Sequence, residues 1–214
     1  MSNVIVLFGK PGAGKGTRLK EFLKGREEDF EAVSVGDLFR AARKSNTELG
    51  QKAASYMDAG QLVPDKLVNE LVIEGLQKAE KPIFIDGFPR TIVQAEAMVR
   101  AGICPLVIEF YVDDEIVFER ARNRIVCPAC GATYTLNEFD PPKVEGICDK
   151  CHTELGKRSD DREEVVSNRL EVYRHDTYPV LDFLASIGIR TFTVDNSDPE
   201  SARRLFADFV LSSL

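Results

Sequence analysis

The chain has 214 residues, of which 43% are hydrophobic and 29% are charged, and its formal net charge is −7. This length suits one globular domain with room for small inserted segments, and no stretch reaches the roughly 18 consecutive apolar residues of a membrane span. The acidic balance argues against broad binding to nucleic acid or to anionic membranes. We therefore expect small anions as partners and, because the N-terminus lacks a basic leader, a cytoplasmic location.

Five short apolar runs recur along the chain, with helical stretches between them. The runs are Val4–Phe8, Ala32–Val35, Ile83–Asp86, Leu106–Val112 and Arg190–Val194. Strands that alternate with helices predict a parallel sheet. The unbroken hydrophobicity of Val4–Phe8 indicates that helices cover both faces of the sheet. The sequence thus predicts an α/β fold of three layers around a five-stranded parallel sheet.

Two stretches interrupt this rhythm. Residues 34–63 keep apolar side chains at three- and four-residue spacing, which predicts a small helical insert. Residues 125–161 hold paired cysteines, prolines and glycines, which predict short strands around a metal. The core would comprise residues 1–33, 64–124 and 162–214, with late helices over Arg162–Arg174, Pro179–Ile187 and Pro199–Leu211.

Residues Gly9–Thr17 read GKPGAGKGT and join the first apolar run to a helical stretch that begins at Lys15. Glycines let consecutive backbone N–H groups turn toward an anion, while the helix N-terminus and Lys15 add positive charge. The segment predicts a phosphate-binding loop and a fold of the P-loop NTPase type. Gly16 separates Lys15 from the hydroxyl of Thr17, so the motif is a variant. A glycine-rich turn without a ligand is the alternative.

Several arginines follow predicted strands or flank the cysteines. Arginine suits phosphate because its planar fork donates two parallel hydrogen bonds and keeps its charge. An isolated arginine is more often a solvated surface charge, so the pattern matters more than any one residue. The candidates are Arg40, Arg90, Arg120, Arg124, Arg158 and Arg169.

The chain resembles the adenylate kinases in five successive motifs. These are GKPGAGKGT, SVGDLFR, MDAGQLV, DGFPRT with Gln94 after it, and RARNR before the cysteines. The likeness spans nearly the whole chain, and DGFPR is far more specific than the glycine loop alone. The resemblance implies reversible phosphoryl transfer from Mg-ATP to AMP, giving two ADP, by a monomeric enzyme.

The resemblance also implies roles for individual residues. The ATP-binding set is Gly12, Ala13, Gly14, Lys15, Gly16, Thr17, Arg120, Arg124 and Phe139. The AMP-binding set is Val35, Arg40, Gly60, Leu62, Val63, Gly87, Arg90, Gln94, Arg158 and Arg169. The catalytic set is Lys15, Asp86, Arg90, Arg124, Arg158 and Arg169. Residues 34–63 would bind AMP, and residues 125–161 would form a lid that keeps water from the reaction.

Asp86 would orient the waters around magnesium, although a carboxylate there could instead satisfy nearby backbone donors. Phe139 could touch the ATP base or pack within the lid. The acceptor phosphate is already largely ionised at neutral pH, because its second pKa is about 6. A catalytic base is therefore unnecessary, and in-line transfer would depend on positioning and on positive charge.

Cys127, Cys130, Cys148 and Cys151 form two C-x-x-C pairs separated by 17 residues. This spacing is typical of a structural zinc site, because four thiolates complete a tetrahedron and leave no open position for water. A redox dithiol pair or bound iron are the alternatives. We expect Cys104, which lies outside these pairs, to be a small buried hydrophobic residue.

Two other functions stay open at this point. Many adenylate kinases carry threonine where this chain has Val35, and loss of that hydroxyl allows a nucleoside monophosphate kinase of other or broad acceptor preference. A zinc-ribbon nucleic-acid-binding module fused to a nucleotide-dependent switch is the second alternative. The absence of a basic run among the residues between the cysteine pairs argues against it.

Overall fold

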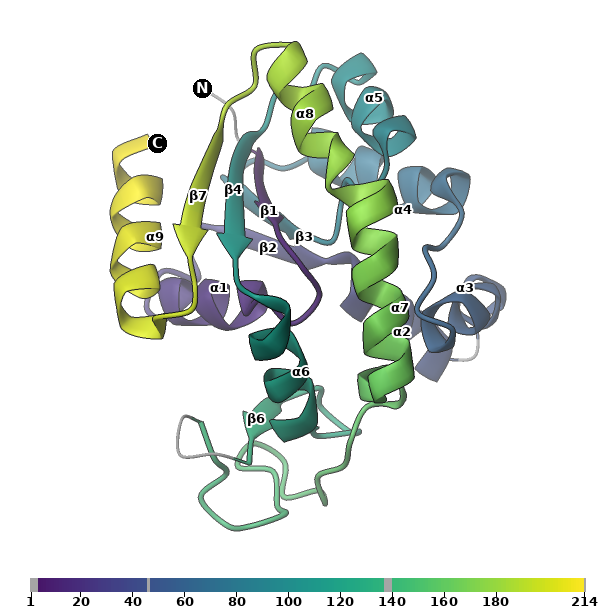
Figure 1. Cartoon of the computed structure of the whole chain (residues 1–214), viewed down its shortest axis with the longest axis vertical. Helices are drawn as coiled ribbons and strands as arrows, with labels where there is room; N and C mark the ends of the chain where they lie inside the picture. Colours follow the sequence, from purple (N-terminus) through teal and green to yellow (C-terminus); the bar gives the residue numbers. More distant parts are fainter. Residues whose placement is uncertain (1–3, 46, 137–139, 214) are drawn as a thin grey trace.

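The computed structural model describes residues 4–45, 47–136 and 140–213. At its centre lies a five-stranded parallel sheet with the strand order β2-β3-β1-β4-β7, shown in Figure 1. Its strands are β1 (Val4–Phe8), β2 (Glu31–Ser34), β3 (Ile83–Asp86), β4 (Leu106–Tyr111) and β7 (Thr191–Asp195). The predicted three-layer α/β fold is confirmed, and each predicted strand is found to within one residue at its ends.

Val35 was predicted to end the second strand, but it opens the helix α2 (Val35–Lys44) instead. The side chain of Ser34 accepts a hydrogen bond from the backbone N–H of Asp37 at 3.3 Å. A serine that accepts such a bond satisfies a donor that the first helical turn leaves unpaired. The chain therefore turns from strand to helix between Ser34 and Val35.

Helices cover both faces of the sheet, as the uninterrupted apolar strands require. The side chains of Ile5 and Leu7 pack on one face, and those of Val4, Val6 and Phe8 on the other. The first face is covered by α1 (Lys15–Leu23), α6 (Asp114–Asn123) and α9 (Pro199–Ser213). The second is covered by α4 (Asp65–Gln77), α5 (Ile92–Arg100) and α8 (Pro179–Ser186) (Figure 1).

The last third of the chain holds one long helical run where the sequence predicts two helices. It consists of α7 (Glu163–Val172), the π-helical turn η2 (Tyr173–Thr177) and α8. The backbone N–H of Tyr178 donates to the carbonyl of Tyr173 at 2.7 Å, five residues back. The wider turn accommodates Pro179, which has no N–H to donate and whose ring would clash in a regular helix.

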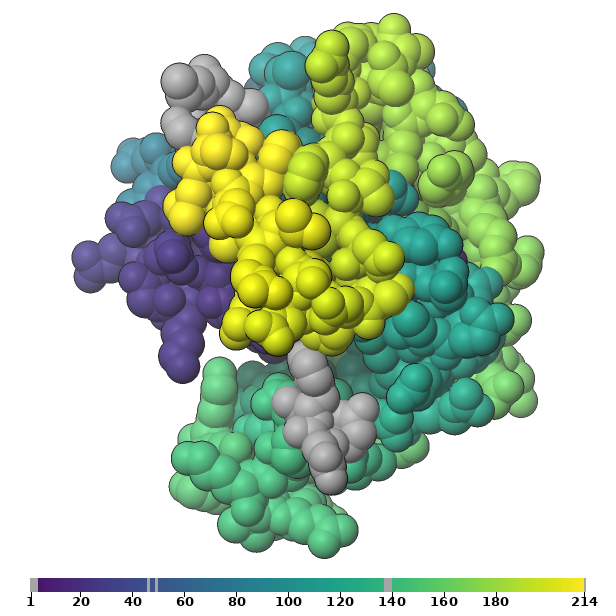
Figure 2. All heavy atoms as spheres, turned by 60° about the vertical axis from the view of Figure 1, so that its left-hand side comes forward, coloured from purple at the N-terminus to yellow at the C-terminus, as the bar shows by residue number. Residues whose placement is uncertain are grey.

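Two inserted segments extend from this core. In residues 34–63, α2 is followed by α3 (Glu48–Asp58), which Thr47 caps by accepting from the N–H of Gly50 at 3.1 Å. The second segment begins with β5 (Arg124–Val126), which starts one residue before the predicted boundary and pairs antiparallel with β6 (Thr133–Thr135), and it ends with η1 (Ser159–Asp161), which leads into α7. The second segment forms a separate lobe at the bottom of Figure 2.

Cys104 is exposed, so the prediction that it is a buried hydrophobic residue is wrong. It lies in the loop before β4, where its neighbours Ile103 and Pro105 turn inward and Cys104 faces outward.

Within the described part of the chain, none of the helices is long and apolar enough to cross a membrane.

The close packing of α2 against α3 predicts opposite effects for two glycine substitutions. A Cβ atom on Gly50 would lie 2.2 Å from the backbone carbon of Ala42, whereas one on Gly75 in α4 would meet nothing within 4 Å. We expect Gly50→Ala to lower the free energy of unfolding by about 1–3 kcal/mol through overpacking. Gly75→Ala should raise it by about 0.5–1 kcal/mol, because alanine favours the helix.

Urea denaturation of both variants and the unmodified protein measures these changes. Gly75→Ala is the matched control, since it makes the same chemical change on a helix that has free space. Equal stabilisation by both substitutions would contradict the close contact between α2 and α3.

Candidate active site

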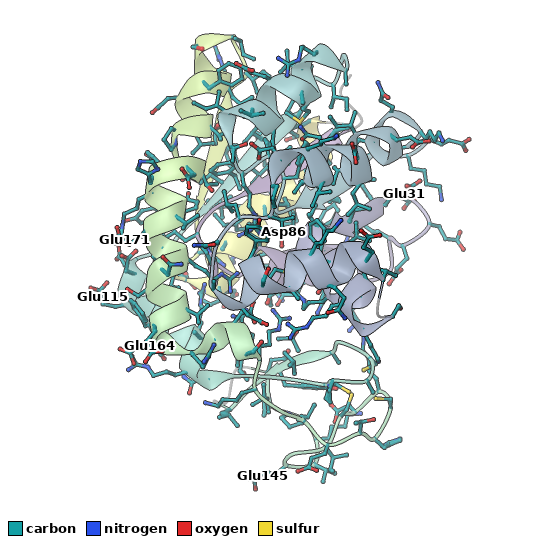
Figure 3. The ribbon with its side chains drawn as sticks, turned by 90° about the vertical axis from the view of Figure 1, so that its right-hand side faces the viewer. Glu31, Asp86, Glu115, Glu145, Glu164 and Glu171 are labelled. Carbon is teal, nitrogen blue, oxygen red and sulfur yellow. The ribbon has the colours of Figure 1, made fainter. Side chains whose placement is uncertain are left out.

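A cleft of about 1190 Å³ lies at the carboxyl ends of the central strands, between the two inserted segments. The loop after β1, the start of α2, the β3–α5 loop and residues of α6, α7 and the cysteine-bearing segment line it. Asp86, the last residue of β3, lies in the interior of the molecule in Figure 3, whereas the labelled glutamates lie at its periphery. The parallel sheet therefore directs its carboxyl ends into one cavity.

The glycine-rich loop connects β1 to α1 at the floor of this cleft. Gly12 and Gly14 adopt positive φ angles of 80° and 86°, which glycine reaches without strain. A Cβ atom on Gly14 would lie 2.5 Å from the side-chain nitrogen of Asn196, so any larger residue would also clash. The predicted loop-to-helix geometry is present, with α1 beginning at Lys15.

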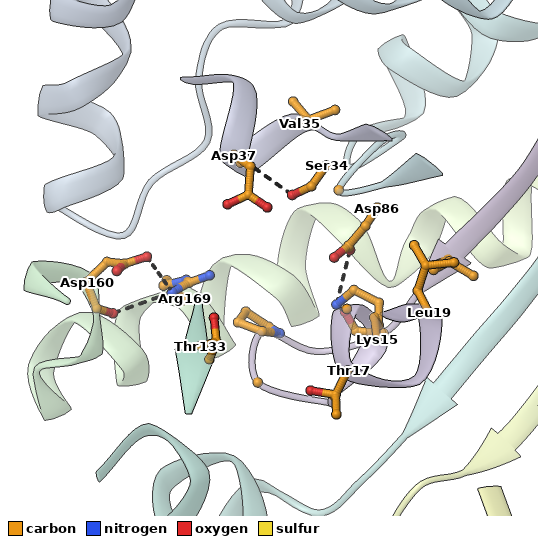
Figure 4. Close-up of a pocket in the computed structure, with 18 of the residues that line it drawn as sticks. Lys15, Thr17, Leu19, Ser34, Val35, Asp37, Asp86, Thr133, Asp160 and Arg169 are labelled. Atoms are coloured by element: carbon orange, nitrogen blue, oxygen red, sulfur yellow. Dashed lines mark hydrogen bonds and ion pairs between the residues drawn. The ribbon is translucent and has the colours of Figure 1, made fainter. Parts of the chain in front are cut away.

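Lys15 spans the loop and points toward the end of β3. Its Nζ donates to the carbonyls of Gly9 at 2.9 Å and Lys10 at 3.0 Å, and lies 3.7 Å from a carboxylate oxygen of Asp86 (Figure 4). Burial lowers the pKa of Lys15, and the charge of Asp86 partly opposes this shift. The ammonium is thus poorly solvated and available to an anion in the cleft.

Arg90 and Arg169 approach the same space from the β3–α5 loop and from α7. Arg90 Nε donates to the carbonyl of Gly87 at 3.0 Å, and Arg169 donates to a carboxylate oxygen of Asp160 at 3.1 Å. Burial lowers the pKa of both guanidinium groups, that of Arg169 to about 10. Removing such charges from water is costly unless a partner offsets the loss.

Three further arginines line the cleft near the inserted segments. Arg124 donates through two nitrogens to the carboxylate of Asp161, and Arg40 donates to Asp37 at 2.7 Å. Burial lowers the pKa of Arg158, as do the positive charges of Arg124 and Arg40. The predicted arginines therefore form one cluster of like charge.

Arg120, from α6, contacts the glycine-rich loop and the end of β7. Its guanidinium donates to the carbonyl of Asn196 at 2.7 Å and to that of Gly12 at 3.4 Å. Ala13 is an exception among the predicted ATP-binding residues. Its methyl group is buried in the core, and its N–H donates to the carbonyl of Lys10 at 3.1 Å.

The predicted AMP-binding residues line the same cleft as the glycine-rich loop. Those in its lining are Val35, Arg40, Gly60, Leu62, Val63, Gly87, Arg90, Gln94, Arg158 and Arg169. Gln94 is 2% exposed, and its carboxamide is held by Arg90 and Asp65. The lining also includes Gly16 and Thr17, whereas Phe139 lies outside the described residues.

The four paired cysteines converge although their two pairs are far apart in the sequence. Their Sγ atoms all lie within 4.8 Å of one another, with Cys127 and Cys151 at 3.3 Å and Cys130 and Cys148 at 3.5 Å. These separations exceed a disulfide bond of about 2.05 Å. They fit a tetrahedral zinc site, where Zn–S bonds of about 2.3 Å place the sulfurs about 3.8 Å apart.

The surroundings of Cys148 also favour a thiolate ligand. Desolvation raises its pKa, but hydrogen bonds from Tyr134 and from backbone N–H groups outweigh this effect and hold the pKa at about 6. The Tyr134 hydroxyl lies 3.5 Å from the sulfur. The donor set therefore suits a metal that binds sulfur, and zinc is the metal we expected from the spacing.

Several residues of the cleft were absent from the sequence-based set. Asp37, Asp160 and Asn196 line the cleft, and Asp161 accepts hydrogen bonds from Arg124, which lines it. Asp160 and Asp161 closely follow a predicted arginine, and Asn196 follows a strand at the edge where ligands bind in such sheets. These positions in the sequence are the features from which the residues could have been predicted.

Comparison with known proteins agrees with the geometry. A family model described as adenylate kinase matches residues 7–189. The adenylate kinase of Lachnospira eligens is 44% identical over 202 residues, covering 91% of this chain and 93% of the relative. The adenylate kinase of Carboxydothermus hydrogenoformans is 47% identical over 192 residues, covering 86% and 88%. That of Bacillus subtilis is 45% identical over 191 residues, covering 86% and 87%. The chain therefore belongs to the adenylate kinase family.

Proposed function

We propose that this protein catalyses the reversible transfer of a phosphoryl group from Mg-ATP to AMP, giving two ADP. The observation that carries the proposal is the convergence of the largely buried side chains of Lys15, Arg90 and Arg169 in one cleft beside the glycine-rich loop. Membership of the adenylate kinase family supports the same reaction. A site with this much buried positive charge gains stability when a polyanion enters it.

The two substrates would enter from opposite ends of the cleft. The glycine-rich loop and Lys15 would hold the ATP phosphates, with Arg120 beside the adenine of ATP, where a guanidinium can stack. Arg40 and Arg90 would hold the AMP phosphate, and its base would lie near Val35 and Gln94. Their positions around one cavity support this assignment.

The chemistry would need positioning and charge rather than a base. The acceptor phosphate is already ionised, and neither His152 nor His175 lines the cleft. Lys15 would move its contact to the transferring phosphoryl group, and the arginines from both sides would stabilise the charge that spreads over its oxygens. The burial of Lys15 and Arg169 strengthens each of these interactions.

Magnesium would enter with ATP and neutralise part of the phosphate charge. Asp86 suits this role because magnesium prefers oxygen ligands and waters, and its carboxylate lies in the cleft beside Lys15. The hydroxyl of Thr17 also lines the cleft and could face the same ion.

Shielding from water would come from the two inserted segments, residues 34–63 as the AMP-binding insert and residues 125–161 as the lid. The side chain of Lys44 in α2 donates to the carbonyl of Ala129, between Cys127 and Cys130, at 2.8 Å. Ser159 donates to a carboxylate oxygen of Asp58 at the end of α3 at 3.0 Å. These contacts across the cleft support a lid that closes over bound substrates.

The lid would depend on zinc for its structure. Its small core contains Ile125, Ala132 and Tyr134 together with Cys127 and Cys148. So few apolar groups supply little folding free energy, and a metal held by four thiolates would supply the rest. A cytoplasmic monomer that does not bind nucleic acid remains our prediction from the sequence.

The first test is an assay of the purified protein with Mg-ATP and each of AMP, GMP, CMP and UMP, measuring diphosphate formation. We expect the highest kcat/KM with AMP. Comparable turnover of another monophosphate would favour a kinase of different or broad acceptor preference. Absence of transfer to all four acceptors would contradict the proposed function.

A second test addresses Lys15. Lys15→Met keeps the length of the side chain and removes its charge, so we expect kcat to fall by about 100- to 1000-fold because a transition-state charge loses its partner. Lys66→Met is the control, since Lys66 is 85% exposed and lies on the outer side of α4. Steady-state kinetics would count against the role of Lys15 if both variants retained full activity.

A third test addresses the metal. Native mass spectrometry should detect one zinc ion per chain, and Cys148→Ser should lose it while Cys104→Ser keeps it. Because the metal stabilises only the folded lid, its loss should expose residues 125–161 to limited proteolysis. Retention of zinc by the Cys148→Ser protein would be inconsistent with the four-cysteine site.

A further inference from the structure

We propose that Asp65 is a positioning residue that determines base specificity, because it fixes the orientation of the Gln94 carboxamide. In this orientation Gln94 matches the edge of adenine and mismatches that of a 6-oxopurine such as hypoxanthine. The inference rests on the proposed function, since it takes the base of the acceptor nucleotide to lie against Gln94.

Two neighbours of opposite character hold the carboxamide. The backbone N–H of Arg90 donates to Oε1 of Gln94 at 2.7 Å, and Nε2 of Gln94 donates to a carboxylate oxygen of Asp65 at 2.8 Å. An amide N–H can only donate, and an ionised carboxylate can only accept. The oxygen and the nitrogen of the Gln94 side chain are therefore assigned by chemistry.

Reversing the carboxamide would break both contacts at once. The amide nitrogen would then face the N–H of Arg90, and the amide oxygen would face the carboxylate of Asp65. Gln94 is only 2% exposed, so water cannot compensate for the lost hydrogen bonds. The buried position of Gln94 thus turns two ordinary hydrogen bonds into a fixed orientation.

Asp65 is itself held in place by the element that carries Gln94. It is the first residue of α4, and the same carboxylate oxygen accepts from the hydroxyl of Thr91 at 2.9 Å. Thr91 in turn accepts from the backbone N–H of Gln94 at 3.1 Å and caps α5. Three residues therefore form a closed network behind the cleft.

Position separates the roles of these residues. Gln94 and Arg90 line the cleft, whereas neither Asp65 nor Thr91 is among the described residues of its lining. Asp65 therefore influences a bound base indirectly, through the Gln94 carboxamide that it holds. A residue of this kind affects the choice between two bases without contacting either of them.

The chemistry of the purine edge makes the orientation matter. Adenine presents an amino group that donates beside a ring nitrogen, N1, that accepts. Hypoxanthine presents an oxygen that accepts beside an N1–H that donates, which is the reverse pattern. The remaining lone pair of Oε1 and the remaining N–H of Nε2 suit adenine in the observed orientation.

Val35 makes the contribution of Gln94 more important. It is buried at the start of α2 and also lines the cleft, but its side chain offers neither a donor nor an acceptor. Discrimination at a base-reading site depends on groups that are left unpaired by the wrong substrate. In this chain the oriented carboxamide supplies that penalty.

The test compares AMP with inosine monophosphate, which differs from AMP only at this edge of the base. Asp65→Asn can donate or accept, so it no longer enforces the orientation of Gln94. We expect the ratio of kcat/KM for AMP to that for inosine monophosphate to fall about tenfold, with the KM for ATP unchanged. Glu70→Gln is the control, because Glu70 lies exposed on the same helix and undergoes the same charge change.

A double-mutant cycle shows whether Asp65 acts through Gln94. In a Gln94→Leu background, Asp65→Asn should leave the ratio of the two kcat/KM values unchanged. A ratio that Asp65→Asn does not change in the otherwise unmodified protein would overturn the inference. Two other outcomes would also overturn it. One is an equal fall in kcat/KM for AMP and for inosine monophosphate, and the other is a change of the ratio in the Gln94→Leu background as large as in the otherwise unmodified protein.

The assay also separates this inference from the proposed function. If the unmodified protein fails to phosphorylate AMP, the proposed function itself is wrong, and the inference fails with it. If the unmodified protein prefers AMP but Asp65→Asn keeps the full preference, only the inference fails.

Discussion

The crowding of positive side chains into one cleft is the constraint on which the rest of the site depends. Lys15, Arg90 and Arg169 are largely removed from water, and burial together with neighbouring positive charges lowers the pKa of each. Such a cluster is tolerable only because carboxylates offset it at short range. Asp86 faces Lys15, and Asp160 faces Arg169. These ion pairs hold the cations in place but neutralise only part of their positive charge. The phosphates of a nucleotide can neutralise the rest.

The parallel sheet explains how residues distant in sequence reach this cluster. Ser34 at the end of β2 and Leu7 in β1 both lie in register with Asp86 at the end of β3. Each strand ends at the same edge, so the loops that follow them meet there. Helices on both faces hold the strands in that alignment. The fold thereby determines which loops can contribute to the cleft.

Much of this arrangement could be predicted because local patterns determine it. Strands buried on both faces appear as unbroken apolar runs, and the spacing of the cysteines by itself indicates a metal site. The motif DGFPR likewise identified Arg90, and the arginines around the cysteines proved to line the same cleft. The positions of such residues are determined by neighbours close in the sequence, or by the fact that the strands of a parallel sheet end at the same edge.

Other features depend on tertiary contacts that no local pattern encodes. Cys104 faces outward because its neighbours in a short loop take the buried positions. Pro179 looks like a break between helices, but a π-helical turn lets the chain continue through it. One partner of Gln94 comes from a different helix, 29 residues away along the chain, so its orientation could be found only from the folded structure.

The hydrogen bond from Lys44 to the carbonyl of Ala129, between Cys127 and Cys130, has a thermodynamic consequence. It joins the segment proposed for AMP to the segment proposed as the lid over ATP, so ordering one segment helps to order the other. If the two nucleotides bind these segments as proposed, the first to bind would bear most of the entropic cost of closure, and the second would bear less. Because such coupling is reciprocal, each nucleotide would then strengthen the binding of the other by the same factor. A single exposed lysine would thus contribute to cooperativity between two ligands that it need not touch.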